Sequence, residues 1–175
     1  NNSNAEEYPL FGFVLGLKET FLKKGTKSTG GMFINDYVCE ENVPFIEYLE
    51  SKGAVFLCKT NVPQMLFAME SNNHIYGSVR CPWDKTRSAG GSSGGDGCLT
   101  ALKQVHAAIG SDIAGSGRIP AAFCGVNSIM LSPARVDRLA HMAVFDHKDF
   151  YPTLPDAQYG IRPTFAVTGR QIKDT

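Results

Sequence analysis

The sequence predicts an α/β fold with a mostly parallel sheet, and the order of its apolar segments is the main evidence. An amphipathic segment at 44–52 precedes an unbroken apolar run at 54–58, and a helix followed by a buried strand is typical of α/β wrapping. The same order recurs where small residues at 94–103 precede an apolar run at 105–109. Because 175 residues with 43% hydrophobic and 19% charged side chains suffice for one core, we expect a single domain.

The first predicted strand is the apolar, aromatic-rich run at 9–19, which carries Lys18 near its carboxyl end. Strand ends are where α/β proteins build their sites, so Lys18 is a candidate site residue. The polar, glycine-bearing stretch at 23–31 is expected to form a loop that covers the site.

The elements that follow are predicted from periodicity and from helix start and stop signals. The helix at 44–52 has one apolar side and begins at Pro44, and the strand at 54–58 is expected to be covered on both faces. A turn and helix at 61–69 and loops up to residue 89 come next. Then follow a helix at 94–103, a strand at 105–109, a helix at 118–124 and a buried strand at 126–131. The region 133–159 has no clear periodicity and is predicted to be a poorly patterned loop.

Two serine-containing glycine clusters, at 90–95 and 110–118, are where we expect chemistry. Glycine orders at a high entropic cost and packs no side chain, so such a run indicates that the backbone must approach something closely. Small residues around Ser116 could let successive N–H groups point at one oxygen. A hydroxyl beside such a group of amides suggests acyl transfer.

Several separated motifs, occurring in order, resemble the amidase signature family, a group of hydrolases that use a Ser-Ser-Lys triad. The motifs are GGSSGG at 90–95, DIAGS at 112–116 with RIP at 118–120, KTNVPQ at 59–64, CPWD at 81–84 and AAFCGV at 121–126. The resemblance runs from about residue 9 to 136 and is greatest for the fatty acid amide hydrolase branch. It implies a mixed, mostly parallel twisted sheet between helices, present here as a single partial amidase domain over 1–175.

The resemblance also implies a role for each site residue. Lys18 is the base, Ser92 the relay and Ser116 the nucleophile, and a buried Lys18 with no carboxylate beside it would be neutral enough to act. The oxyanion hole is expected from the backbone N–H groups of Ile113, Ala114, Gly115 and Ser116. Supporting roles fall to Ser93, Asp112 and Arg118, of which the last two flank the nucleophile loop at a spacing that could let them pair. The resemblance further implies a cis peptide at Ser92 and a small-molecule amide substrate such as a fatty acid amide, with no cofactor and no metal.

Departures from the family pattern leave a rival hypothesis open, namely a catalytically silent amidase-like fragment or pseudoenzyme. Gly16, Gln104 and Gly117 replace residues that the family usually carries, and the motif at 130–132 differs as well. Gly117 is expected to loosen the first turn of the helix at 118–124 by roughly 0.5–1 kcal/mol relative to alanine.

Other assignments of the same residues are less favoured. The pattern G-x-S-x-G at 91–95 would make Ser93 the nucleophile of an α/β-hydrolase elbow, with His141 or His147 as the base, but no strand-like run precedes it. A phosphate-binding loop is disfavoured because no Lys-Ser or Lys-Thr follows the glycines. Lys59 is interpreted as structural.

Composition limits the partners and the compartment. Lys and Arg number 17, as do Asp and Glu, and no basic stripe is present, so we expect no nucleic acid partner. Five cysteines without a CxxC pair indicate free thiols in a reducing compartment. With no membrane-spanning run and no signal peptide, an intracellular, cytoplasmic location is expected, and peripheral membrane association and oligomeric state are left open. The first residue is not Met, which predicts an excised piece of a longer chain.

Overall fold

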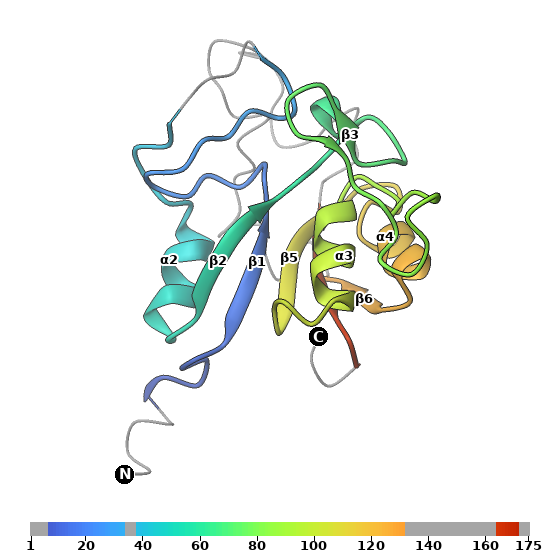
Figure 1. Cartoon of the computed structure of the whole chain (residues 1–175). Coiled ribbons are helices and arrows are strands. Elements are labelled where there is room, and N and C mark those ends of the chain that lie inside the picture. The colour runs from blue at the N-terminus through green and yellow to red at the C-terminus, as the bar shows by residue number, and fades with distance from the viewer. Residues whose placement is uncertain (1–6, 34–37, 132–163, 172–175) are drawn as a thin grey trace.

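The computed structural model describes residues 7–33, 38–131 and 164–171, and the region predicted as a poorly patterned loop at 133–159 lies outside them. Within this described part, five strands form one sheet in the order β2-β1-β5-β7-β6 (Figure 1). The strands are β1 (Val14–Lys18), β2 (Val55–Thr60), β5 (Ala107–Asp112), β6 (Asn127–Met130) and β7 (Thr164–Gly169). β1 pairs parallel with β2 and β5, whereas β7 is antiparallel to both β5 and β6. The mixed, mostly parallel sheet is therefore confirmed.

The helices predicted at 44–52, 94–103 and 118–124 are present, whereas the helix predicted within 61–69 is only a short 3-10 turn. They are α2 (Pro44–Ser51), α3 (Gly94–Ala101) and α4 (Arg118–Cys124), together with the short 3-10 turn η1 (Gln64–Leu66). Proline begins α2 because its fixed φ suits a first turn and its missing N–H would have no partner there. The two-residue strands β3 (Asn72–Asn73) and β4 (Gly77–Ser78) form a small antiparallel hairpin within the predicted loop region.

The two faces of the sheet differ in chemistry because successive side chains of a strand point to opposite sides. Leu15, Leu17 and Ile109 pack with Phe45 and Ile46 of α2 in the main apolar cluster. The alternate positions of the same strands carry Gly16, Lys18 and Gly110, and this second face is the one that meets α3. The first face therefore builds the core, and the second carries Lys18.

Small residues let α3 approach the second face closely. A Cβ atom added at Gly95 would lie 2.7 Å from the backbone nitrogen of Asn61 and 2.8 Å from Cβ of Thr60. The close approach predicted for the glycine cluster is thus made to the carboxyl end of β2, within the chain itself.

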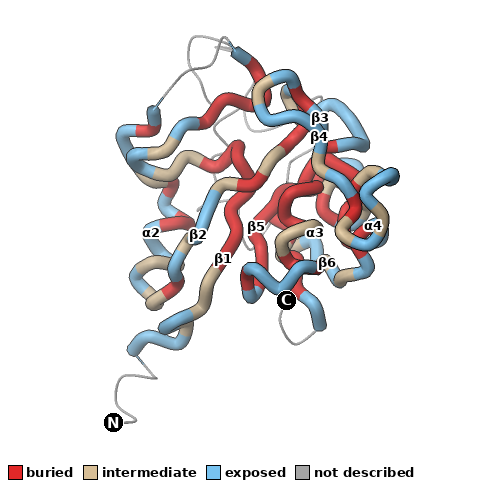
Figure 2. The backbone as a smooth tube through the Cα atoms, in the orientation of Figure 1, coloured by how far each residue is buried: buried red, intermediate tan, exposed pale blue. Residues whose placement is uncertain are grey.

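Two predictions of burial were wrong, and both concern the outer strands of the sheet (Figure 2). Val55 and Leu57 of β2 are 53% and 57% exposed, so the strand predicted to be covered on both faces is not. Met130 of β6 is 42% exposed, although a buried strand was predicted there. Both strands lie at edges of the described sheet, whereas all six residues of the central β5 are buried. An apolar run therefore indicated a strand correctly but not its place in the sheet.

Among residues 7–33, 38–131 and 164–171, no helix has the length and apolar character needed to cross a membrane. The same residues contain no group of three or more His, Cys, Asp or Glu side chains able to hold a metal ion. The five cysteines are free thiols.

Candidate active site

Lys18 lies at the carboxyl end of β1 and has no exposed surface. Its Nζ donates to Oγ of Ser92 at 2.8 Å, to Oγ of Ser111 at 2.9 Å and to the Ser111 carbonyl oxygen at 3.3 Å. The structure thus brings together two of the residues that the sequence singled out, Lys18 and Ser92.

Burial controls the charge of Lys18. Desolvation lowers the pKa of Lys18 to about 7, although the carboxylates of Asp96 and Asp112 act in the opposite direction. Burial therefore favours the neutral amine of Lys18, the form that can accept a proton.

Ser92 is held in a turn that leads into α3. The peptide bond between Gly91 and Ser92 is cis, as the resemblance implied. Oγ of the buried Ser71 accepts a hydrogen bond from the Gly94 N–H at 2.8 Å and donates to the Ser92 carbonyl at 3.3 Å. Ser71, which sequence reasoning did not identify, therefore holds the turn by hydrogen bonds to both Ser92 and Gly94.

Ser116 lies next to this turn. The Ser93 N–H donates to the Ser116 carbonyl oxygen at 3.0 Å, which places the second glycine cluster beside the first. Ser116 is half-buried, and the transfer of a proton between its hydroxyl and that of Ser92 remains a prediction.

Ser93 does not have the setting of an exposed nucleophile. Only 1% of its surface is exposed, and its hydroxyl donates to the Ser111 carbonyl at 3.4 Å. The two histidines proposed as its base, His141 and His147, lie outside the described residues. The buried hydroxyl favours the supporting role over the elbow.

Asp112 organises the loop that carries Ser116. Its carboxylate accepts hydrogen bonds from the Gly115 N–H at 2.7 Å and the Gly117 N–H at 3.1 Å, and it pairs with the Arg118 guanidinium through Nε at 2.9 Å and Nη2 at 3.0 Å. Burial alone would raise the pKa of Asp112, but the Arg118 guanidinium and the backbone N–H groups together lower it to about 2. The predicted pairing of Asp112 with Arg118 is present.

One of the four N–H groups predicted to form the oxyanion hole is already in use, because the Gly115 N–H donates to Asp112. The N–H groups of Ile113, Ala114 and Ser116 are the remaining candidates. Their role in an oxyanion hole remains a prediction, and it rests on three donors in place of four.

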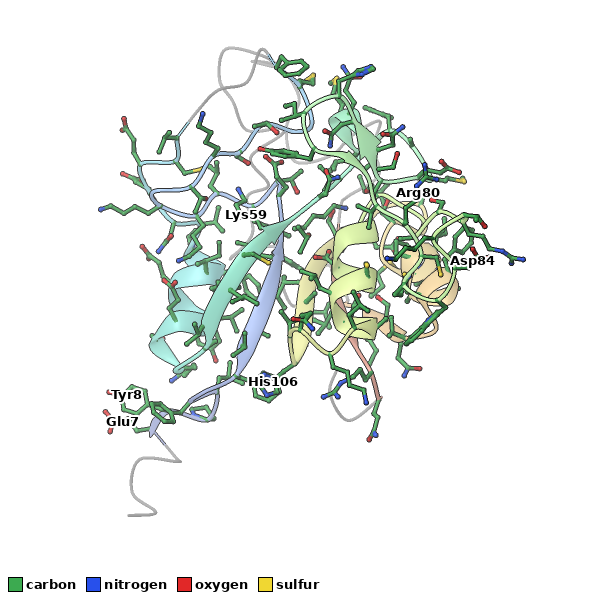
Figure 3. The ribbon with its side chains drawn as sticks, in the orientation of Figure 1. Glu7, Tyr8, Lys59, Arg80, Asp84 and His106 are labelled. Carbon is green, nitrogen blue, oxygen red and sulfur yellow. The ribbon has the colours of Figure 1, made fainter. Side chains whose placement is uncertain are left out.

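The loop at 23–31 is fixed to the end of β1 by Glu19. The Glu19 carboxylate accepts from the Thr29 N–H and, at 3.0 Å, from the Gly30 N–H, while Oγ of Ser28 donates to the Glu19 carbonyl at 2.8 Å. Lys59 donates to the Lys27 carbonyl at 2.9 Å, which agrees with its structural interpretation (Figure 3). This loop therefore covers the end of the strand directly after Lys18.

The sequence interpretation missed two polar groups of the site. Ser111, next to Asp112 at the end of β5, contacts Lys18 directly. Asp96 is a fully buried carboxylate in the first turn of α3, and its charge opposes the lowering of the Lys18 pKa, although no hydrogen bond or ion pair joins it to Lys18 among the described residues. A lone acidic residue among small residues was the signal that could have identified Asp96.

Comparisons with known proteins agree with the motifs. The family model described as Amidase matches residues 1–129. A glutamyl-tRNA(Gln) amidotransferase subunit of Anaeromyxobacter sp. (strain K) is 37% identical over 135 residues, which cover 77% of this chain and 27% of that protein. Fatty-acid amide hydrolase 1 of Sus scrofa is 38% identical over 130 residues, which cover 74% of this chain and 22% of that protein.

A solved structure shows the same similarity in three dimensions. The structure of 6-aminohexanoate cyclic dimer hydrolase complexed with substrate matches with a TM-score of 0.76 and 28% identity, covering 99% of this chain and 35% of that one. The chain spans about a quarter of the length of the two curated relatives. The family model, the relatives and the fold together show that the chain belongs to the amidase family.

Proposed function

We propose that this chain carries the reacting residues of a serine hydrolase that cleaves the C–N bond of carboxamides. The observation that supports this function most directly is the contact of 2.8 Å between the buried Nζ of Lys18 and Oγ of Ser92. A lysine that is partly neutral near pH 7 and in contact with a hydroxyl has what a general base requires.

In the proposed reaction the proton moves along a line of three side chains. The neutral amine of Lys18 takes the proton of the Ser92 hydroxyl, and Ser92 takes the proton of Ser116 as Ser116 Oγ bonds to the carbonyl carbon. The relay then runs in reverse and delivers the proton to the leaving nitrogen, so the C–N bond breaks and an acyl-enzyme ester remains. Water hydrolyses the ester through the same relay and restores Ser116.

Charge on the carbonyl oxygen would be stabilised by the N–H groups of Ile113, Ala114 and Ser116. Asp112 supports this arrangement, because its bonds to the N–H groups of Gly115 and Gly117 hold the loop around Ser116. Removing one such oxyanion donor typically lowers the rate by about 10²–10³.

Fatty acid amides are the substrate subclass that we propose, since the motifs are most similar to those of that branch. The identity to fatty-acid amide hydrolase 1 is 38%, against 37% to the glutamyl-tRNA(Gln) amidotransferase protein, so identity alone does not select the branch. Release of ammonia from a long-chain fatty acid amide, but not from glutamine, is the expected result.

Labelling with a fluorophosphonate probe, which modifies activated serines, tests the proposed function on the full chain. We expect labelling at Ser116, its loss in Ser116→Ala and a strong decrease in Lys18→Ala, because the nucleophile needs its base. Ser78→Ala, at an exposed serine of β4, is the matched control and should label normally.

Two results would contradict this function. No labelling of a folded sample would favour the catalytically silent alternative. Labelling that persists in Ser116→Ala and is lost in Ser93→Ala would favour the elbow arrangement.

A further inference from the structure

Ser111 presents two oxygen atoms to the amine of Lys18. Nζ of Lys18 lies 2.9 Å from the Ser111 hydroxyl oxygen, 3.3 Å from the Ser111 carbonyl oxygen and 2.8 Å from Oγ of Ser92. All three residues are buried, so the amine exchanges hydrogen bonds with these oxygen atoms and not with bulk water. Two of its three partners therefore come from a single residue that the proposed reaction does not yet use.

The position of Ser111 is fixed by the sheet. It is the second-last residue of β5, the strand that pairs with β1 on one side and with β7 on the other, where Ser111 is opposite Phe165. Its carbonyl also accepts a hydrogen bond from the Ser93 hydroxyl at 3.4 Å. Because Lys18 ends β1, sheet pairing holds both oxygen atoms of Ser111 in place relative to the strand that carries the base.

The two protonation states of Lys18 use the three oxygen atoms differently. An ammonium has three N–H groups, one for each oxygen, whereas a neutral amine has two N–H groups and one lone pair. A carbonyl oxygen has no proton to give, so the lone pair faces either the Ser111 hydroxyl or the Ser92 hydroxyl. It faces Ser92, as a base for Ser92 requires, when both oxygen atoms of Ser111 accept from the amine.

We propose that Ser111 is a positioning residue whose hydroxyl and carbonyl oxygens hold two N–H groups of Lys18 and leave the third position of the nitrogen to Ser92. The proposal deepens the proposed function and rests on it, since Lys18 is the base of that reaction. The proton moves from Oγ of Ser92 to Nζ of Lys18, the electron pair of the broken O–H bond stays on the Ser92 oxygen, and no covalent bond of Ser111 changes. The ammonium that forms then has all three acceptors in place.

Ser111→Ala is the direct test, because it removes the hydroxyl and leaves the carbonyl. The ammonium of Lys18 loses one of three acceptors, and hydrogen bonds to charged groups are strong enough that we expect its titration midpoint to decrease by about 1 unit. The amine is also less well oriented, so the labelling rate on the alkaline plateau should decrease by about 10-fold or more. A lower midpoint together with slower labelling distinguishes a positioning role from a merely structural one.

Two further variants control for changes in packing. Ser111→Thr keeps the hydroxyl and suits a strand, so it should restore both the midpoint and the labelling rate. Thr168→Val removes a buried hydroxyl from β7, which β5 separates from β1, and this hydroxyl donates to Ser128 at 3.3 Å. Thr168→Val should change neither quantity.

The midpoint is measured on the full chain by NMR, from the pH dependence of the ¹³Cε resonance of Lys18, assigned by its loss in Lys18→Arg. Asp96 from α3 and Asp112 from β5 favour the charge of Lys18, and both are retained in every variant, so a difference in midpoint reports the Ser111 hydroxyl. Because this titration does not require activity, a protein that is never labelled but whose midpoint decreases in Ser111→Ala and returns in Ser111→Thr refutes the hydrolase and supports the contact.

An unchanged midpoint in Ser111→Ala would overturn the inference, even in a protein that is labelled at Ser116. Faster labelling of Ser111→Ala would also overturn it, because the Ser111 hydroxyl would then be donating to the lone pair in competition with Ser92. So would equal changes in Thr168→Val, which would indicate general loosening of the sheet. If Ser111→Thr does not fold, the comparison of Ser111→Ala with Thr168→Val decides.

Discussion

Asp112 shows how much of the site depends on a single carboxylate. It lies at the end of β5, and its two oxygens hold the Gly115 and Gly117 N–H groups and the Arg118 guanidinium. Its pairing with Arg118 could be predicted because both residues flank one short loop. The contact between Asp96 and the end of β2 could not, because residues 60 and 96 are distant in sequence and meet only after the sheet has formed.

Asp112→Asn should lower the free energy of unfolding near neutral pH. Because the pKa of Asp112 is about 2 when folded and near 4 when unfolded, its carboxylate contributes roughly 3 kcal/mol above pH 4. The sign follows from proton binding: the unfolded chain binds more protons between pH 4 and 2, so this contribution is lost as the pH falls through that range. Urea unfolding at pH 6.5 and at pH 3 measures the difference between the two proteins.

Asp84→Asn is the control for that measurement, since Asp84 is an exposed carboxylate that also pairs with an arginine, Arg87. A loss of stability in Asp84→Asn as large as in Asp112→Asn, or a loss in Asp112→Asn that does not shrink at acid pH, would contradict the account of Asp112.

At the scale of elements, α4 begins and ends where the sequence predicts, and the structure adds a packing reason for the glycine before it. The sequence suggested that Gly117 loosens the first turn of the helix. In the structure a Cβ atom at Gly117 would lie 2.4 Å from Cβ of Ala166 on β7 and 3.1 Å from Oγ of Ser128 on β6. Glycine is required there because α4 starts directly against two strands that come later in the sequence.

Gly117→Ala should therefore destabilise the protein, in contrast to the gain that helix propensity alone would predict. Overpacking of this kind typically costs about 1–3 kcal/mol. Ala166→Gly removes the opposing methyl group, so the double variant Gly117→Ala/Ala166→Gly should recover part of the loss. Urea unfolding of the two single variants and the double variant gives the coupling, and strictly additive effects would show that the two methyl groups do not meet.

At the scale of the whole molecule, burial decreases from the centre of the sheet to its edges (Figure 2). Every residue of β5 is buried between β1 and β7, whereas β2 and β6 each have one neighbouring strand among the described elements. Both the apolar core and the site depend on β5, since Ile109 lies in the core and Ser111 contacts Lys18.

Hydrogen exchange should follow this arrangement. We expect the amides of β5 to exchange most slowly, because they open only when the sheet comes apart, and those of β2 and β6 to exchange faster through fraying at the edges. Exchange followed by mass spectrometry on overlapping peptides measures this order. Equal protection of 55–60 and 107–112 would contradict it.

The sequence by itself determined the α/β class, the approximate bounds of the helices and strands, and the residues that carry the amidase motifs. These follow from local properties, namely periodicity, capping residues and the order of short motifs. Only the tertiary structure decided which strands lie at an edge, which face of β1 carries Lys18 toward α3, and that Ser111 contacts its amine. The physical reason is that burial and electrostatic coupling depend on neighbours from distant segments, and β1, β2, α3 and β5 become neighbours only when the sheet and its helices pack.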